Sequence, residues 1–183
     1  LKGNKINLIK TSVMLKKSIY ILATATMLAS CGGKTDEKEK PKAKVETLKE
    51  TDIYNFNVVE SYAKNVHDTI ITGAKKLFLN AIDMYRNKKD AAGSVAEFKK
   101  SLTKYPTSKT YYELGNALID AENYKEAIES FHMAEKFDYN PISKVLYNLA
   151  CAYSLSEDAD NSLKYVQLAI ENGHLADEPV ARL

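Results

Sequence analysis

Apolar positions in the second half of the chain recur at helical spacing, and the whole pattern repeats. Leu114 and Leu118 lie four residues apart and therefore share one helix face. Similar pairs occur 33 residues earlier and 35 residues later, at Ala81 and Tyr85 and at Leu149 and Tyr153. Each pair is followed by a second apolar pattern, whose large residues are Phe98, Phe131 and Val166. Each period therefore predicts two successive helices.

Polar dipeptides and helix breakers divide the repeating region into segments. The expected turns within the helix pairs are Lys89-Asp90, Glu122-Asn123 and Glu157-Asp158. Pro106, Pro141 and Gly173 come just after the second helix of each pair, where helices commonly stop. The pattern predicts an all-α fold with helices over residues 74–88, 91–104, 108–121, 124–136, 142–155 and 159–172.

Residues 51–73 form a lead-in segment with a mixed pattern. Tyr54, Phe56 and Val58 alternate with asparagines, which is the period of a strand. Val59 and the apolar positions after it instead follow helical spacing. We expect a short extended segment, then a helix from about residue 58 that can continue past Gly73.

The N-terminal region has the pattern of an export signal. The chain begins at Leu1, whereas Met14 is followed by two lysines and then by the uncharged segment 18–30. A short positive region before an apolar run and small residues is typical of a secretory signal. We interpret residues 14–30 as a signal peptide and residues 1–13 as upstream sequence translated in frame.

The end of this segment, Leu28-Ala29-Ser30-Cys31-Gly32, resembles the bacterial lipobox. The resemblance implies that Cys31 carries a diacylglyceryl group and becomes the first residue of the mature lipoprotein. More than one acyl chain makes a stable membrane anchor. The absence of Asp at position 32 favours the outer membrane of the bacterial envelope, with the periplasmic or surface face left open.

Residues 31–50 are predicted to be a disordered tether. From Lys34 to Glu50 the chain has six lysines and five acidic residues, but only two aliphatic residues larger than Ala. Such a segment cannot bury enough apolar surface to offset the entropy lost on ordering. Lys34-Thr35-Asp36-Glu37 also resembles a surface-export signal, with a plain linker as the alternative.

Composition and charge narrow the range of functions that the sequence supports. The 183 residues carry a formal net charge of +2, and five of the 26 basic residues lie within residues 1–30. This balance gives no general case for nucleic-acid binding. Two cysteines cannot form a disulfide framework or a zinc site built on thiolate pairs.

The repeat resembles the tetratricopeptide family, whose unit has about 34 residues and a W-x2-L-G-x2-Y…A-x3-F…P pattern. The middle unit matches this pattern at Tyr111, Leu114, Gly115, Leu118, Ala127, Phe131 and Ala134. The first unit departs from it at Ala81, Ile82 and Ser94, and the third at Ala150 and Ser162. The resemblance implies an α-solenoid of about three repeats over residues 74–173. Residues 174–183 would begin a C-terminal cap, and a further domain after Leu183 remains open.

In the family that the chain resembles, the first helices of the repeats line a concave groove that holds a partner protein or peptide. Transferred to this chain, the candidate partner-binding residues are Lys76, Asn80, Asp83, Asn87, Lys109, Tyr112, Asn116, Asp120, Lys144, Tyr147 and Asn148, with Cys151 beside them. Lys109, Asn116, Lys144 and Asn148 partly reproduce the Lys/Asn set with which some members hold a terminal carboxylate.

Residues for catalysis, a metal or a cofactor are not evident in the sequence, which has no metalloprotease, nucleophile-elbow or phosphate-loop motif. Asp120 and Glu122, and Asp158 and Asp160, lie at turns, where acidic residues are usually solvated or cap a helix. We therefore predict a non-catalytic lipoprotein that binds or scaffolds an envelope protein. The alternatives are an adaptor for a missing C-terminal domain and a surface nutrient- or glycan-binding lipoprotein.

Overall fold

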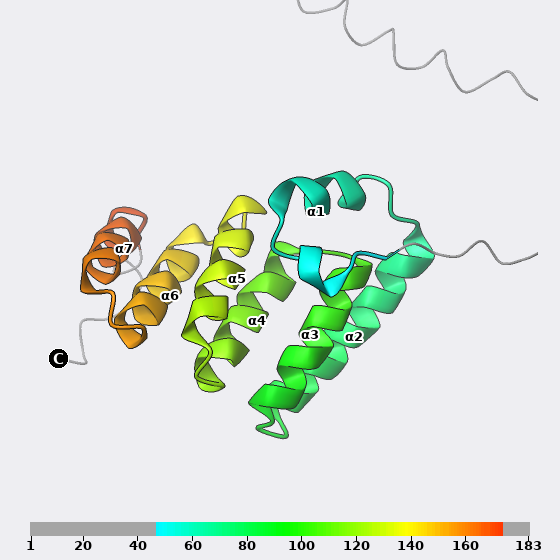
Figure 1. Ribbon diagram of the computed structural model, residues 1–183, viewed down its shortest axis with the longest axis horizontal. Coiled ribbons are helices and arrows are strands. Elements are labelled where there is room, and N and C mark those ends of the chain that lie inside the picture. The colour runs from blue at the N-terminus through cyan, green and yellow to red at the C-terminus, as the bar shows by residue number, and fades with distance from the viewer. Residues whose placement is uncertain (1–46, 174–183) are drawn as a thin grey trace, which may run out of the picture. The chain divides into compact units, whose positions relative to one another are not determined.

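The computed structural model describes residues 47–173, which lie within one compact unit of the chain. The predicted signal peptide, Cys31, most of the predicted tether and the predicted cap lie outside the described residues. A short 3-10 helix, η1, precedes the α-helices (Figure 1). The bounds are η1 Glu50–Asp52, α1 Phe56–Ala63, α2 Asp68–Arg86, α3 Ala91–Lys104, α4 Ser108–Asp120, α5 Tyr124–Lys136, α6 Ile142–Leu155 and α7 Ala159–Glu171.

Helices α2 to α7 form three antiparallel pairs, α2/α3, α4/α5 and α6/α7, with each pair packed on the next (Figure 1). The predicted turns are confirmed, since Lys89, Glu122 and Glu157 have φ values of 57°, 59° and 64°. A left-handed residue reverses the chain, and the next residue then caps the second helix of the pair. These caps are Asp90, Asn123 and Asp158, each of which accepts a backbone N–H in the following turn. The fold is an α-solenoid of three helix-pair repeats.

The lead-in segment differs from the prediction. Residues 47–173 contain no strand, and the helix expected from about residue 58 is split into α1 and α2. The side chain of Asn55 accepts the N–H of Val58 and caps α1, whereas His67 caps α2. Helix α2 passes through Gly73 without a break, as the prediction allowed, and it begins at Asp68, six residues before the start expected for the first helix of the repeats.

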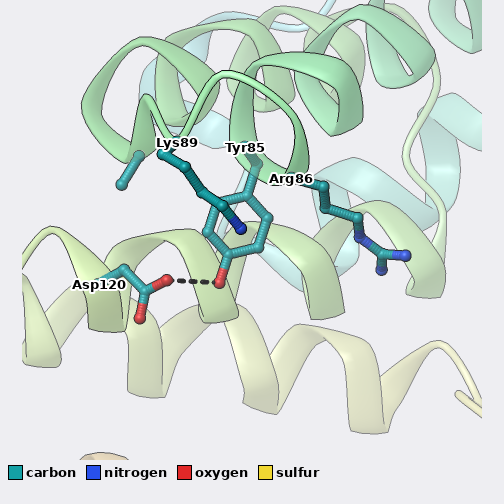
Figure 2. A pocket seen from close by; sticks show the side chains of 5 residues that line it. Tyr85, Arg86, Lys89 and Asp120 are labelled. Carbon is teal, nitrogen blue, oxygen red and sulfur yellow. Dashed lines mark hydrogen bonds between the residues drawn. The ribbon is translucent and has the colours of Figure 1, made fainter.

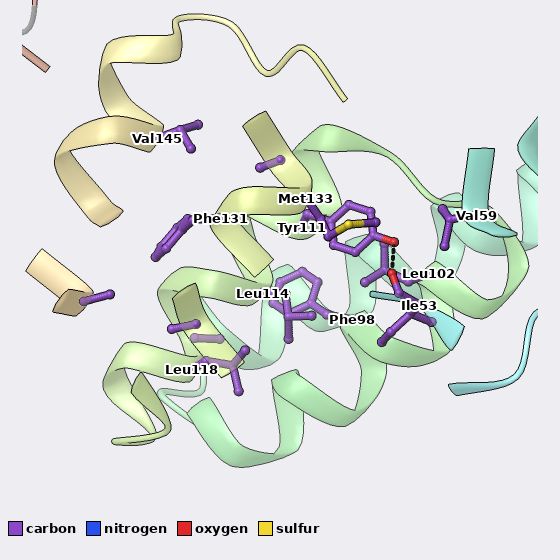
Figure 3. Packing of buried hydrophobic residues seen from close by; sticks show 14 of the residues in the cluster. Ile53, Val59, Phe98, Leu102, Tyr111, Leu114, Leu118, Phe131, Met133 and Val145 are labelled. Carbon is purple, nitrogen blue, oxygen red and sulfur yellow. Dashed lines mark hydrogen bonds between the residues drawn. The ribbon is translucent and has the colours of Figure 1, made fainter. Parts of the chain in front are cut away.

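Residues 47–55, which we call the N-terminal strap, pack against the repeats. The N–H of Leu48 donates to the carbonyl of Thr103 in α3 (2.9 Å), and Ile53 is fully buried. The Tyr111 hydroxyl of α4 donates to the carbonyl of Ile53 (Figure 3). Leu48 is buried although it lies within the predicted tether. The ordered domain therefore begins before the predicted end of the tether.

The strap also crosses to the second repeat through Tyr54. Its hydroxyl lies 3.0 Å from both the carboxylate of Glu126 and the hydroxyl of Ser130 in α5. Lys99 of α3 pairs with the same Glu126 at 2.6 Å. Burial is the main cause that raises the pKa of Tyr54 well above its ordinary value. The strap thus links the first two helix pairs through contacts with α3, α4 and α5.

The core depends on close approach of the two helices of a pair. Phe98 and Phe131 are fully buried, as the periodic pattern predicted (Figure 3). A Cβ added at Gly115 would lie 2.5 Å from Cε1 of Phe131, closer than any real contact. The ring of Phe131 also meets that of Tyr112 edge-on, with the centroids 5.9 Å apart. Gly115 is therefore required because its missing side chain makes room for Phe131.

Val166, the counterpart of Phe98 and Phe131 in α7, differs from them because it is 38% exposed. Ser94 and Ser162 depart from the family's alanine at a position of close contact. Their hydroxyls donate to the carbonyls of Ala91 (2.7 Å) and Ala150 (3.0 Å). The small hydroxyl is tolerated there because a buried polar group that forms a hydrogen bond carries little penalty.

The first two repeats are joined by an ion pair between α2 and α4. Arg86 Nη2 lies 2.7 Å from Glu113 Oε1. The Arg86 side chain is 58% exposed, whereas that of Glu113 is only 7% exposed. Because the carboxylate is buried, removing its partner would leave a poorly solvated charge.

The sign of the stability change should distinguish two of the helical glycines, Gly115 and Gly73. We expect Gly115→Ala to destabilise the chain by about 1–2 kcal/mol, since overpacking costs more than alanine's better helix propensity returns. Gly73→Ala is the matched control, because its Cβ would meet only Lys104 Cδ at 3.8 Å. It should stabilise α2 by up to about 1 kcal/mol. Urea unfolding measures both, and equal effects of the two substitutions would contradict the close approach.

A double-mutant cycle should measure how strongly the buried carboxylate of Glu113 is coupled to Arg86. We expect Arg86→Ala to cost about 1–2 kcal/mol, a value lowered by the exposure of the arginine. In a Glu113→Gln background the same substitution should cost much less, since the neutral amide leaves no buried charge. Urea unfolding of the four proteins gives the coupling free energy. A coupling near zero would show that the pair does not join the repeats.

Candidate partner-binding face

The first helices of the three pairs, α2, α4 and α6, are neighbours along the solenoid. We call their exposed and half-buried side chains the inner face, which includes the predicted partner-binding residues. Hydrogen bonds and ion pairs that cross between these helices include Tyr85–Asp120, Arg86–Glu113, Asn116–Asn148 and Tyr112–Asn148.

Three predicted residues come together at the junction of α4 and α6. The amide of Asn148 donates to the side-chain oxygen of Asn116 at 2.7 Å. Burial raises the pKa of Tyr112, while side-chain hydrogen bonds to Asn116 and Asn148 oppose this shift. The Tyr112 ring stacks on that of Tyr139, with centroids 4.2 Å apart and planes at 16°. This junction presents amide groups and a fixed aromatic ring side by side.

The predicted residues of the first repeat are engaged mainly within their own helix pair. Asn80 donates to Glu97 of α3 at 3.2 Å. Asp83 accepts from Asn87 at 2.8 Å and pairs with Lys88 at 2.9 Å. The hydrogen bond from Asn87 is the main cause that holds the pKa of Asp83 below its ordinary value. These polar groups therefore stabilise the first repeat and offer less to a partner.

Asp120 lies at the end of α4 beside a cleft of about 420 Å³ (Figure 2). Its carboxylate accepts the hydroxyl of Tyr85 at 2.7 Å. Desolvation by burial, followed by this hydrogen bond, raises the pKa of Tyr85 far above its ordinary value. Arg86 and Lys89 line the same cleft (Figure 2). Asp120 thus joins α2 to α4, and this contact explains the acidic residue at this position without a catalytic role.

The three predicted lysines, Lys76, Lys109 and Lys144, are all exposed. Lys109 Nζ lies 5.5 Å from the centre of the Phe78 ring in α2, so this lysine also contacts the preceding repeat. Tyr147 of α6 is 44% exposed. The inner face therefore presents both positive charge and apolar surface to solvent.

Sequence reasoning missed two residues of this face, Leu79 and Arg86, and two residues that support it, the buried Glu113 and the linker residue Tyr139. The repeat offsets could have revealed Leu79, 33 residues before Tyr112, and Glu113, 35 residues before Asn148. Tyr139 lies in the link between α5 and α6, outside the helical pattern, and no periodic signal marks it.

Cys151 and the acidic residues are also candidates for nucleophile or metal chemistry. Burial raises the pKa of the Cys151 thiol, which disfavours the reactive thiolate. Within residues 47–173, no group of three or more His, Cys, Asp or Glu residues could hold a metal ion. No helix in this range is long and apolar enough to span a bilayer.

Comparisons with known proteins agree with this geometry. The tetratricopeptide repeat family matches at residues 108–136 and 143–172, which contain the α4/α5 and α6/α7 pairs. A solved structure described as a CopN-Scc3 complex is similar in fold, with 18% identity and a TM-score of 0.52. The similarity covers 79% of this chain and 75% of that chain. No curated protein matches the sequence. The chain carries tetratricopeptide repeats over residues 108–136 and 143–172. Helices α2 and α3 pack beside them as a further helix pair, outside the matched range.

Proposed function

We propose that the chain is a membrane-anchored, non-catalytic adaptor that binds another protein of the bacterial envelope through its inner face. Tetratricopeptide repeats support a role in protein–protein interaction. The observation that carries the proposal is the junction of Tyr112, Asn116 and Asn148 between two repeats. Amides offer both donors and acceptors to a peptide backbone, and aromatic residues dominate binding energies at interfaces.

The proposed anchor depends on the sequence around Cys31. Ala29 and Ser30 supply the small residues that the lipobox resemblance requires, after a lysine-flanked apolar run. Acylation of Cys31 would hold the domain at the membrane through the charged segment that follows. Such an adaptor would meet its partner at the membrane surface. Lipid labelling tests the anchor, and photo-cross-linking tests the binding face.

Lipid attachment should depend on one of the two cysteines. We expect cells fed an alkyne fatty acid to label the wild-type chain, and Cys31→Ser to abolish that label because the acceptor thiol is gone. Cys151→Ser is the matched control and should keep it, since Cys151 lies within α6. Click detection on a gel measures the label. Equal labelling of the Cys31→Ser chain would reject the anchor.

Photo-cross-linking should show which face meets the partner. We expect benzoylphenylalanine at Tyr147, on the inner face, to form a specific adduct with one envelope protein. Lys125 on α5 is the control position, because it is exposed and lies on a second helix. Mass spectrometry identifies the adduct and the cross-linked peptide of the partner.

Asn148→Ala should weaken the Tyr147 adduct several-fold, since it removes the amide that contacts Asn116. Unfolding curves of the variants show whether the domain remains folded. Adducts formed only from position 125 would move the binding site to the second helices. Adducts from neither position would reject the adaptor function.

A further inference from the structure

Two rows of equivalent residues run across the inner face. Lys76, Lys109 and Lys144 are separated by 33 and 35 residues, the same offsets that relate the repeats. They therefore occupy equivalent positions of the repeat, in the middle of α2 and in the first turn of α4 and α6. We call them the lysine row. Three residues after each lysine come Leu79, Tyr112 and Tyr147, which we call the apolar row. Residues three apart are neighbours on a helix surface, so the two rows run side by side.

The charge of the lysine row is not balanced by the acidic residues of the same face. Glu113 pairs with Arg86, and Asp83 pairs with Lys88. Asp120 accepts the hydroxyl of Tyr85. By contrast, the part of the chain that the structure describes provides no ion pair for any residue of the lysine row. These three acidic side chains have partners within the domain, whereas no described carboxylate pairs with the three ammonium groups, which remain available to carboxylates from outside.

The apolar row presents surface that a partner could cover. Leu79 is 55% exposed and Tyr147 is 44% exposed, while Tyr112 is half-buried against Tyr139. Removing such surface from water is favourable, and the gain grows with the apolar area that is buried. Aromatic rings already held in place lose little freedom on binding. The row therefore suits a ligand with apolar side chains beside its charged edge.

We propose that the inner face recognises an acidic, amphipathic peptide segment of its partner. Carboxylates of the segment contact the lysine row, and apolar side chains beside them cover the apolar row. Neighbouring packed helices lie about 10 Å apart, and an extended chain covers that distance in about three residues. The segment accordingly has acidic residues about three positions apart. This inference rests on the proposed function and specifies the partner's chemistry.

Selection from a random 12-residue peptide library on phage tests the inference. The bait is the full chain in detergent, and selected peptides are then synthesised with a fluorophore for anisotropy measurements. We expect enrichment of peptides with two or more acidic residues next to apolar ones. The triple variant Lys76→Gln, Lys109→Gln and Lys144→Gln should bind them at least about tenfold more weakly, a loss of roughly 1.4 kcal/mol.

A charge-matched control separates the lysine row from net charge. The triple variant Lys125→Gln, Lys136→Gln and Lys164→Gln removes three exposed lysines of the second helices α5 and α7. It should change the Kd less than about twofold, and circular dichroism confirms that both variants fold. An equal loss in both triples, enrichment of neutral or basic peptides, or no enrichment would overturn the inference. If the Tyr147 adduct still forms through a non-acidic segment, only this inference fails, whereas loss of adducts from both position 147 and position 125 rejects the proposed function itself.

Discussion

The close approach of α4 and α5 at Gly115 is the constraint on which the candidate site depends. The missing side chain at Gly115 lets the Phe131 ring lie against α4. That ring meets Tyr112 edge-on, and Tyr112 in turn stacks on Tyr139. The contact network continues through Asn116 to Asn148 of the next repeat. Packing inside one helix pair therefore decides where an aromatic ring and two amides stand on the inner face.

The helix pairs could be predicted from sequence because their signals are local. Lys89, Glu122 and Glu157 each precede a capping residue, and apolar positions recur at offsets of 33 and 35 residues. The strap could not be predicted, because its partners are distant in the sequence. Tyr54 bonds to Glu126, which is 72 residues further along the chain. An alternating apolar pattern predicted an extended segment there, but long-range contacts with α4 and α5 determine the observed conformation.

On the inner face, too, the features that follow from local sequence patterns could be predicted, whereas those that depend on distant contacts could not. Periodicity placed Tyr112, Asn116 and Asn148 on facing helices, and their mutual contacts follow from that placement. It could not show that Asn80 turns to Glu97 of its own pair, since both a groove position and an intra-pair contact satisfy helical spacing. Tyr139 could not be predicted, because the residues of a link between helices show no periodic pattern of apolar positions.

The strap and the inner face use largely different helices, and this separation bears on how an anchored adaptor could work. The chain enters the domain beside α3, where Leu48 bonds to Thr103, and Tyr54 then reaches α5. Both are second helices of their pairs. The lysine and apolar rows belong to α2, α4 and α6. Tension on the proposed tether would therefore act first on the strap contacts with α3, α5 and Tyr111 of α4, of which only the Tyr111 contact lies on a helix that carries the partner-binding rows.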